Sequence, residues 1–124
     1  MRLGAIEILS VPVTDQQRAK EFYEGTLGFK LISDASFGEG RRWVQLEPPG
    51  GGTNITLVTW FDDMRPGSLG GMVIACDDVQ AAYDELRGRG VPFGGPPEDM
   101  EWGRFASLRD PDGNGWLLRQ PPPA

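Results

Sequence analysis

The sequence lacks histidine altogether, and it has only one cysteine and two lysines. Without histidine, no serine or cysteine can pair with an imidazole base, so the common nucleophilic hydrolase chemistries are excluded. Acid–base chemistry would depend on carboxylates such as Glu7, Glu47 and Asp62. Cys76 has no partner for an intramolecular disulfide, and its apolar surroundings favour a small core residue.

Basic side chains and long apolar runs are also scarce. The 12 basic and 18 acidic residues give a net charge of −6, which repels phosphate backbones and anionic membranes. No apolar run approaches the length of a membrane span, and no basic segment leads into an apolar stretch at the start. We therefore expect a cytoplasmic protein that binds neither nucleic acid nor membrane, although acidity also simply keeps small proteins soluble.

Glycine and proline are abundant, with 18 and 11 residues. They cluster between short apolar segments, a pattern typical of turns. The cluster at 48–52 predicts a hairpin loop, and that at 94–97 an irregular excursion. The length of 124 residues and the ordinary globular composition predict a single domain over residues 1–120, followed by a Pro-rich tail at 121–124.

The order of the expected elements repeats. Each half contains a strand, an aspartate suited to cap a helix, a helix ended by glycine, and three further strands. The capping residues are Asp15 and Asp78, and the helices cover about residues 16–27 and 79–87. The expected strands are residues 5–13, 29–34, 41–47, 54–60, 72–76, 91–93, 104–109 and 116–119.

This repeat divides the chain into two βαβββ modules, so the predicted fold class is α+β. Module one covers residues 1–61, a linker covers 62–69, and module two covers 70–120. Before the last strand, the run from Asp110 to Asn114 (DPDGN) predicts a tight hairpin turn. Its proline presets one φ angle, its Asp and Asn side chains cap the turn, and its glycine takes a positive φ.

Three segments resemble signature stretches of the vicinal oxygen chelate family, which includes glyoxalase, bleomycin resistance and extradiol dioxygenase proteins. They are Val11–Leu31, Gly70–Phe93 and Arg109–Leu118, in the family's order and covering almost half of the chain. The resemblance implies that the two modules place their sheets side by side around a half-open barrel-like cavity. It also implies a homodimer, because a second subunit commonly completes the family's cavity.

The resemblance assigns the family's metal-ligand positions to residues without suitable donors. Metal-dependent relatives use His, Gln or Glu there, whereas the matching positions in this chain are Ile8, Thr56, Gly71 and Leu117. Transition metals need imidazole, thiolate or carboxylate donors. We therefore expect no bound metal and no other cofactor, although a site made only of acidic residues, such as Glu7, Glu47, Asp62 and Asp63, is conceivable.

Neighbouring positions complete the expected cavity, because side chains alternate along a strand. Trp60, Phe61 and Trp102 stand where they could stack on a ligand, although packing at the core or a dimer seam is an equally ordinary role. Arg119 either meets an anionic group inside the cavity or reaches solvent. The expected ligand-binding residues are Ile8, Ser10, Gln45, Thr56, Trp60, Phe61, Gly71, Val73, Trp102, Leu117 and Arg119.

These features favour a metal-free binding protein that sequesters an aromatic or cationic small molecule in a cavity at a dimer interface. The acidic charge, the tryptophans and the missing metal ligands all agree with that hypothesis. The alternative is a metal-independent lyase, isomerase or cyclase that acts on a small carbonyl compound through Arg119 and a cavity carboxylate. A purely structural or regulatory module has no positive feature in the sequence.

Overall fold

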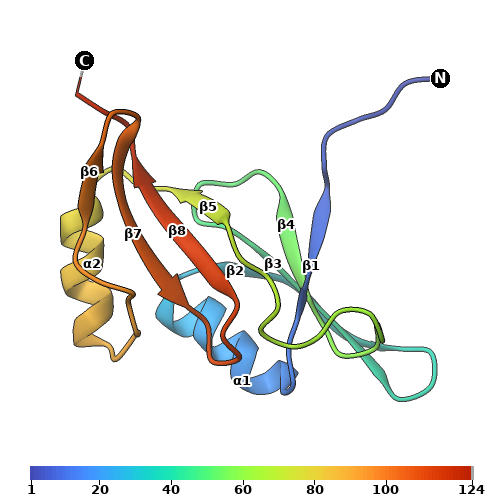
Figure 1. Cartoon of the computed structure of the whole chain (residues 1–124). Coiled ribbons are helices and arrows are strands. Elements are labelled where there is room, and N and C mark those ends of the chain that lie inside the picture. Colours follow the sequence, from blue (N-terminus) through green and yellow to red (C-terminus); the bar gives the residue numbers. More distant parts are fainter. Residues whose placement is uncertain (124) are drawn as a thin grey trace.

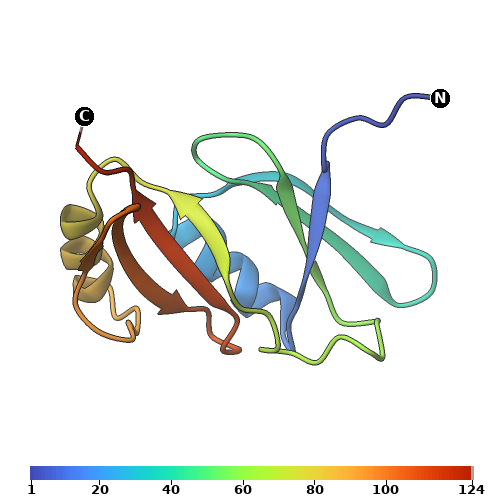
Figure 2. The ribbon, with the colours of Figure 1, turned by 45° about the horizontal axis from the view of Figure 1, so that its top comes forward.

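The computed structural model describes residues 1–123 and contains two four-stranded mixed sheets with helices packed against them (Figure 1, Figure 2). The strand orders are β1-β4-β3-β2 and β5-β8-β7-β6, so the halves share one topology. This confirms the α+β fold of two βαβββ units, and across the described residues the sheets form no closed barrel. The last residue of the expected tail, Ala124, lies outside the described residues.

The bounds of the elements follow the predictions closely in most cases. The elements are β1 (Ile8–Pro12), α1 (Gln16–Lys20), the π-helix η1 (Glu21–Thr26), β2 (Lys30–Phe37), β3 (Arg41–Glu47), β4 (Asn54–Val58), β5 (Met72–Ala75), α2 (Val79–Gly88), β6 (Glu98–Met100), β7 (Gly103–Arg109) and β8 (Gly115–Gln120).

The first helix begins where the sequence predicted but changes type midway. The Asp15 carboxylate accepts a hydrogen bond from a first-turn backbone N–H at 3.0 Å, which confirms the N-cap. The helix then widens into the π-helix η1. There the backbone N–H of Leu27 donates to the carbonyl of Phe22, five residues earlier, instead of the four residues of an α-helix. Phe22 and Tyr23 are buried in this segment. Gly28 has a φ of 80°, as expected of a left-handed helix stop.

The second helix matches its predicted position. The Asp78 carboxylate caps α2 at 3.0 Å, and Gly90 beyond its end has a φ of 88°. Val79, Tyr83 and Leu86 form its buried face, as helical periodicity requires. Within residues 1–123, no helix is both long and apolar enough to cross a lipid bilayer.

The predicted strand over residues 91–93 is wrong. The backbone N–H of Val91 donates to the carbonyl of Leu86 at the end of α2, and Pro92 has no N–H for a sheet. Only an isolated bridge joins Phe93 to β7. The edge strand of this sheet is β6, which follows the Gly/Pro-rich excursion and pairs antiparallel with β7.

The first strand is also shorter than predicted. It begins at Ile8, not at residue 5, because its partner β4 begins at Asn54 directly after the glycine loop. Residues before Ile8 therefore have no strand alongside them, and Ile6 is 67% exposed. β4 ends at Val58, two residues before the predicted end.

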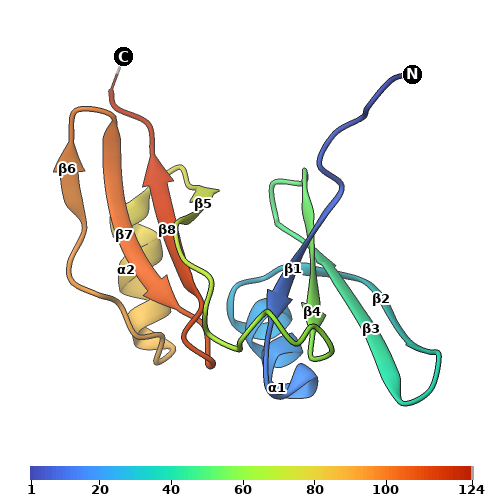
Figure 3. The ribbon, with the colours of Figure 1, turned by 45° about the vertical axis from the view of Figure 1, so that its right-hand side comes forward.

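One hydrophobic core joins the helix-facing sides of both sheets. Figure 3 shows α1 between the two sheets and α2 against the second sheet. The ring of Tyr23, from η1, lies 5.6 Å from Phe29 and 5.9 Å from Trp116 of β8. The two modules are thus packed together by a module-one helix against a module-two strand.

The DPDGN run forms the predicted hairpin turn between β7 and β8, and it also joins the modules. One oxygen of the buried Asp110 carboxylate accepts from the Tyr23 hydroxyl at 2.7 Å and from Asn114 Nδ2 at 2.8 Å. The other accepts from the backbone N–H groups of Asp112 and Asn114, each at 2.9 Å. Asn114 Nδ2 also donates to the Pro12 carbonyl at the end of β1. Burial, reinforced by Asp110, holds the pKa of Tyr23 far above its ordinary value, so the phenol remains a donor.

A surface ion cluster ties α1 to the first sheet and predicts a pH effect. Hydrogen bonds from Arg42 at 2.7 Å and Lys20 at 2.9 Å hold the pKa of Asp34 well below its usual range. A depressed carboxyl pKa adds stability above the unfolded-state value of about 3.9, and that stability is lost as the pH falls through the folded value. The stability gap between the wild type and Asp34→Asn should therefore narrow as the pH falls below 3.9.

Chemical denaturation of the wild type and Asp34→Asn across the acid range measures this gap. Glu39→Gln, at an exposed position in the neighbouring turn, is the matched control and should give a curve parallel to that of the wild type. A constant difference between the wild type and Asp34→Asn at all pH values would contradict the expectation.

Candidate functional site

The predicted cavity residues of module one lie in register on one face of the first sheet. Ser10 pairs with Thr56, and Thr56 pairs with Gln45, so the three form one row across β1, β4 and β3. Ile8 lies in the next row beside Asn54. This face is opposite the helix-facing side, as the two-residue alternation predicted.

Several polar side chains in and beside these rows form hydrogen bonds within module one. Thr56 is buried, and its hydroxyl donates to the Val44 carbonyl at 3.0 Å. The Gln45 amide oxygen accepts from the Trp43 indole N–H at 3.1 Å, and its Nε2 donates to Asn54 Oδ1 at 2.8 Å. The row is therefore held in a fixed arrangement before any ligand arrives.

An aromatic cluster borders this face at the β2–β3 hairpin. The Phe37 ring lies 5.9 Å from Trp43 and 5.1 Å from Trp60, in edge-to-face geometry. Phe61 is 6.1 Å from Trp60 and 45% exposed. Trp60 and Phe61 were predicted as ligand-binding residues, whereas Phe37 and Trp43 were not. Trp43 could have been found, because it lies two residues from Gln45 on the same strand and so shares its face.

The predicted residues of module two also share one face of their sheet. Val73, Leu117 and Ser107 form one row across β5, β8 and β7. Ala75, Arg119 and Phe105 form the next. Phe105 and Ser107 were not predicted, although each is the direct sheet neighbour of a residue that was.

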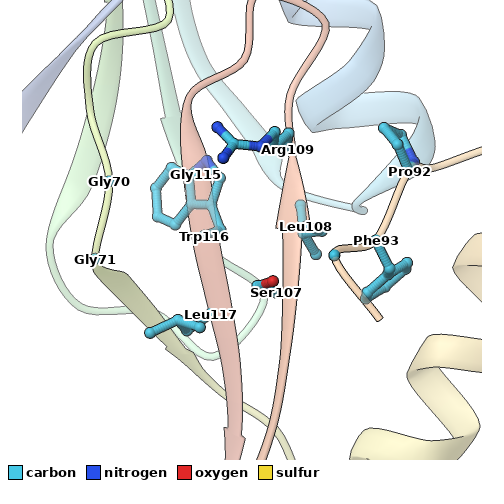
Figure 4. Close-up of a pocket in the computed structure, with 11 residues that line it drawn as sticks. Gly70, Gly71, Pro92, Phe93, Ser107, Leu108, Arg109, Gly115, Trp116 and Leu117 are labelled. Carbon is cyan, nitrogen blue, oxygen red and sulfur yellow. The ribbon is translucent and has the colours of Figure 1, made fainter. Parts of the chain in front are cut away.

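Two adjoining grooves cover this face and share Gly94, Ser107 and Leu117. The first has a volume of about 310 Å³, and Figure 4 shows Leu117 and Ser107 within it, between Gly71 and Phe93. The second has a volume of about 330 Å³ and is lined by aromatic and aliphatic side chains, including Met100, Trp102 and Phe105. Gly71, Leu117 and Trp102 therefore lie along one continuous surface.

Trp102 lies in the turn between β6 and β7, where its side chain is 60% exposed. Arg119 reaches the same turn: Nε and Nη2 donate to the Trp102 carbonyl oxygen at 3.0 and 2.8 Å. Neither of the two predicted alternatives for Arg119 included this contact, because the turn could not be placed beside β8 from the sequence.

Across residues 1–123, the two sets of predicted residues line different cavities. The groove around Leu117 is walled by module two alone, and the hollow that contains Gln45, of about 640 Å³, by module one alone. A third cavity, of about 470 Å³, lies between the modules and is lined by core-side residues such as Leu9, Ile55 and Trp116, and of the predicted residues it contains only Val73. The chain thus presents two separate surfaces, one on each module, which we call the candidate half-sites.

The fold agrees with the comparisons to known proteins. The model of the Glyoxalase/Bleomycin resistance protein/Dioxygenase superfamily matches residues 5–118. The chain belongs to this superfamily. The match spans both modules, so the resemblance read from three sequence segments extends through nearly the whole chain.

Several known proteins resemble the chain over nearly its full length. TnmS3, described as an antibiotic binding protein from Streptomyces sp. CB03234, is 45% identical with a TM-score of 0.91, covering 98% of this chain and 99% of its own. A glyoxalase/bleomycin resistance protein from the same organism is 46% identical with a TM-score of 0.84, covering 94% and 100%. YetH, an uncharacterized protein of Bacillus subtilis (strain 168), is 36% identical over 118 residues, covering 93% and 97%.

The residues at the superfamily's metal positions do not fit a transition metal. Ile8, Gly71 and Leu117 have no donor atom, and the Thr56 hydroxyl is already bonded to a carbonyl. Among residues 1–123, no three Cys, Asp or Glu side chains gather where they could share an ion. No catalytic step through such a metal can be derived from these half-sites.

Proposed function

We propose that the protein is a metal-free binding protein that sequesters an aromatic, uncharged or cationic antibiotic-like compound between two copies of the chain. The observation that carries this proposal is the pair of separate aromatic half-sites on a scaffold very similar to that of an antibiotic binding protein. Planar rings offer large contact areas at low entropic cost, which suits capture of a conjugated ligand.

The second copy is needed because each half-site is open on its own. The module-one wall has Trp60 and Phe61 at its border, and the module-two wall has Trp102 and Leu117. We place the module-one wall of one subunit against the module-two wall of its partner. Exposed apolar side chains on the sheets support such an association, since Val73 is 51% and Trp102 60% exposed.

Binding is favoured over catalysis by how the polar groups of the walls are used. Gln45 and Thr56 are bonded within module one, and the Arg119 guanidinium is directed to a backbone carbonyl. Amide, hydroxyl and guanidinium groups do not act as general bases near neutral pH, and these three are already bonded within the scaffold. The net charge of −6 adds a mild preference for cationic ligands.

Two measurements test the proposal. Light scattering is expected to give twice the chain mass of 13.6 kDa. Titration of a panel of aromatic antibiotics, with daunorubicin as its planar cationic member, is expected to quench tryptophan fluorescence and raise Tm without product formation. A monomer at tens of micromolar, or turnover of the bound compound, would contradict the proposal.

A further inference from the structure

The contact between Arg119 and the β6–β7 turn links two of the predicted ligand-binding residues. Both hydrogen bonds from the guanidinium end on one acceptor, the carbonyl oxygen of Trp102. Arg119 lies in β8, a strand paired on both sides within the second sheet. The donor is therefore anchored in a regular strand, whereas the acceptor belongs to a turn at the sheet's edge.

The turn has little room to adjust. Gly103 follows Trp102 with a φ of 140°, and a Cβ there would clash with the Gln120 carbonyl oxygen. Across the hairpin, Arg104 Nε donates to Asp99 at 2.7 Å. The turn is thus held by a close backbone approach to β8, by an ion pair between its strands, and by Arg119.

We propose that Arg119 is a positioning residue, whose guanidinium fixes the backbone of Trp102 so that the indole stands over the groove of module two. The indole lines that groove together with Met100 and Phe105, yet 60% of its surface is exposed. Arg119 acts here through Trp102 and does not meet an anionic group of the ligand. The inference rests on the proposed function only in taking this groove as the ligand site.

Fixing an exposed aromatic ring before binding improves affinity, because less side-chain and loop entropy is lost when the ligand arrives. Because the two N–H donors belong to one planar guanidinium group, they constrain the direction of the Trp102 carbonyl as well as its distance. Lysine would supply a single mobile ammonium group in place of the planar guanidinium, and methionine no donor, while both keep an apolar stem against the sheet. Comparison of Arg119→Lys with Arg119→Met therefore separates the effect of the positive charge from that of the planar guanidinium geometry.

The first test observes Trp102 in the ligand-free protein. With 5-fluorotryptophan at the four tryptophan positions, ¹⁹F NMR gives a signal for each, and Trp102→Phe assigns one. In Arg119→Met, the Trp102 signal should narrow and move toward that of free fluorotryptophan while the other three stay in place. In Arg119→Lys it should move part of the way. An unchanged Trp102 signal in Arg119→Met would overturn the proposal.

The second test is a double-mutant cycle with daunorubicin as the probe. Arg119→Met should weaken daunorubicin binding by about five-fold in the wild type and by much less in a Trp102→Ala background. An equal loss in both backgrounds would mean that Arg119 contacts the ligand itself, and the proposal would be wrong. Absence of daunorubicin binding to the wild type would count against the proposed function, and the ¹⁹F result would still decide the role of Arg119.

Discussion

Replacing Asp110 by Asn is expected to lower the free energy of unfolding by about 3 kcal/mol. The carboxylate is 3% exposed and accepts four hydrogen bonds, from Tyr23, the Asn114 side chain and two backbone N–H groups. An amide replaces one acceptor with a donor. In either orientation of the substituted amide, its NH₂ group would face groups that are themselves donors. At least one donor would then have no acceptor in a site closed to water, and an unpaired buried polar group lowers the stability of the folded state.

The effect should also be cooperative across the modules. Tyr23 belongs to η1, and its hydroxyl accepts from the Trp116 indole N–H at 2.9 Å while it donates to Asp110. Tyr23→Phe should therefore destabilise as well, and the double variant should cost less than the sum of the two. Urea denaturation measures each loss. Asp62→Asn, at an exposed position, is the control for the lost charge and should stay within about 0.5 kcal/mol of the wild type.

A result within experimental error of the wild type for Asp110→Asn would show that the turn does not join the modules in the way described. A loss of stability confined to a separate, early unfolding transition would also contradict this description, because the shared core predicts that both sheets unfold together.

Replacing either Trp60 or Trp102 by Ala is expected to weaken ligand binding by about ten-fold, because each removes a ring from one of the two walls. Trp60 packs against Phe37 at 5.1 Å, with the Arg41 guanidinium 6.0 Å from its ring. Trp102 lines the module-two groove. Trp60→Phe and Trp102→Phe retain a planar ring and should recover most of the affinity. Fluorescence titration against the best compound of the panel gives all four values.

Neither alanine variant should lower the unfolding free energy as much as Asp110→Asn does, because Trp60 is only partly buried and Trp102 is largely exposed. If both alanine variants bound the compound as tightly as the wild type, the aromatic walls would not be the binding surface.

Much of the fold could be predicted because local physical rules act strongly at particular residues. Asp15 and Asp78 cap helices because their carboxylates satisfy free backbone N–H groups, and Gly28 and Gly90 end them with positive φ. The alternation in β1, β3 and β8 set which residues share a face. The strand predicted at 91–93 failed because the backbone N–H of Val91 is used by the helix end, a competition that apolar content does not reveal.

The sequence was enough to predict which candidate residues share a sheet face, but not how distant segments meet. Period-two alternation placed Ser10, Gln45 and Thr56 on one face, and the register agrees. Contacts between distant segments could not be predicted from the sequence. Asp110 and Tyr23, whose side chains are hydrogen-bonded, are 87 residues apart, and Arg119 is 17 residues from Trp102, whose carbonyl it contacts. Such contacts depend on how whole elements pack, whereas turn chemistry indicated only a hairpin at DPDGN.

The central claim is that one ligand site takes its two walls from two chains, and a mixing experiment tests it directly. Trp60→Ala and Trp102→Ala chains, each weak in binding alone, are unfolded together and refolded as a mixture. In a mixed dimer, one site receives both defects and the other receives two intact walls, so about a quarter of all sites in a random mixture should regain wild-type affinity. Fluorescence titration of the mixture should therefore show a tight phase that neither parent has. If each site lies within a single chain, every site keeps its defect, and a mixture that binds no more tightly than its parents would contradict the claim.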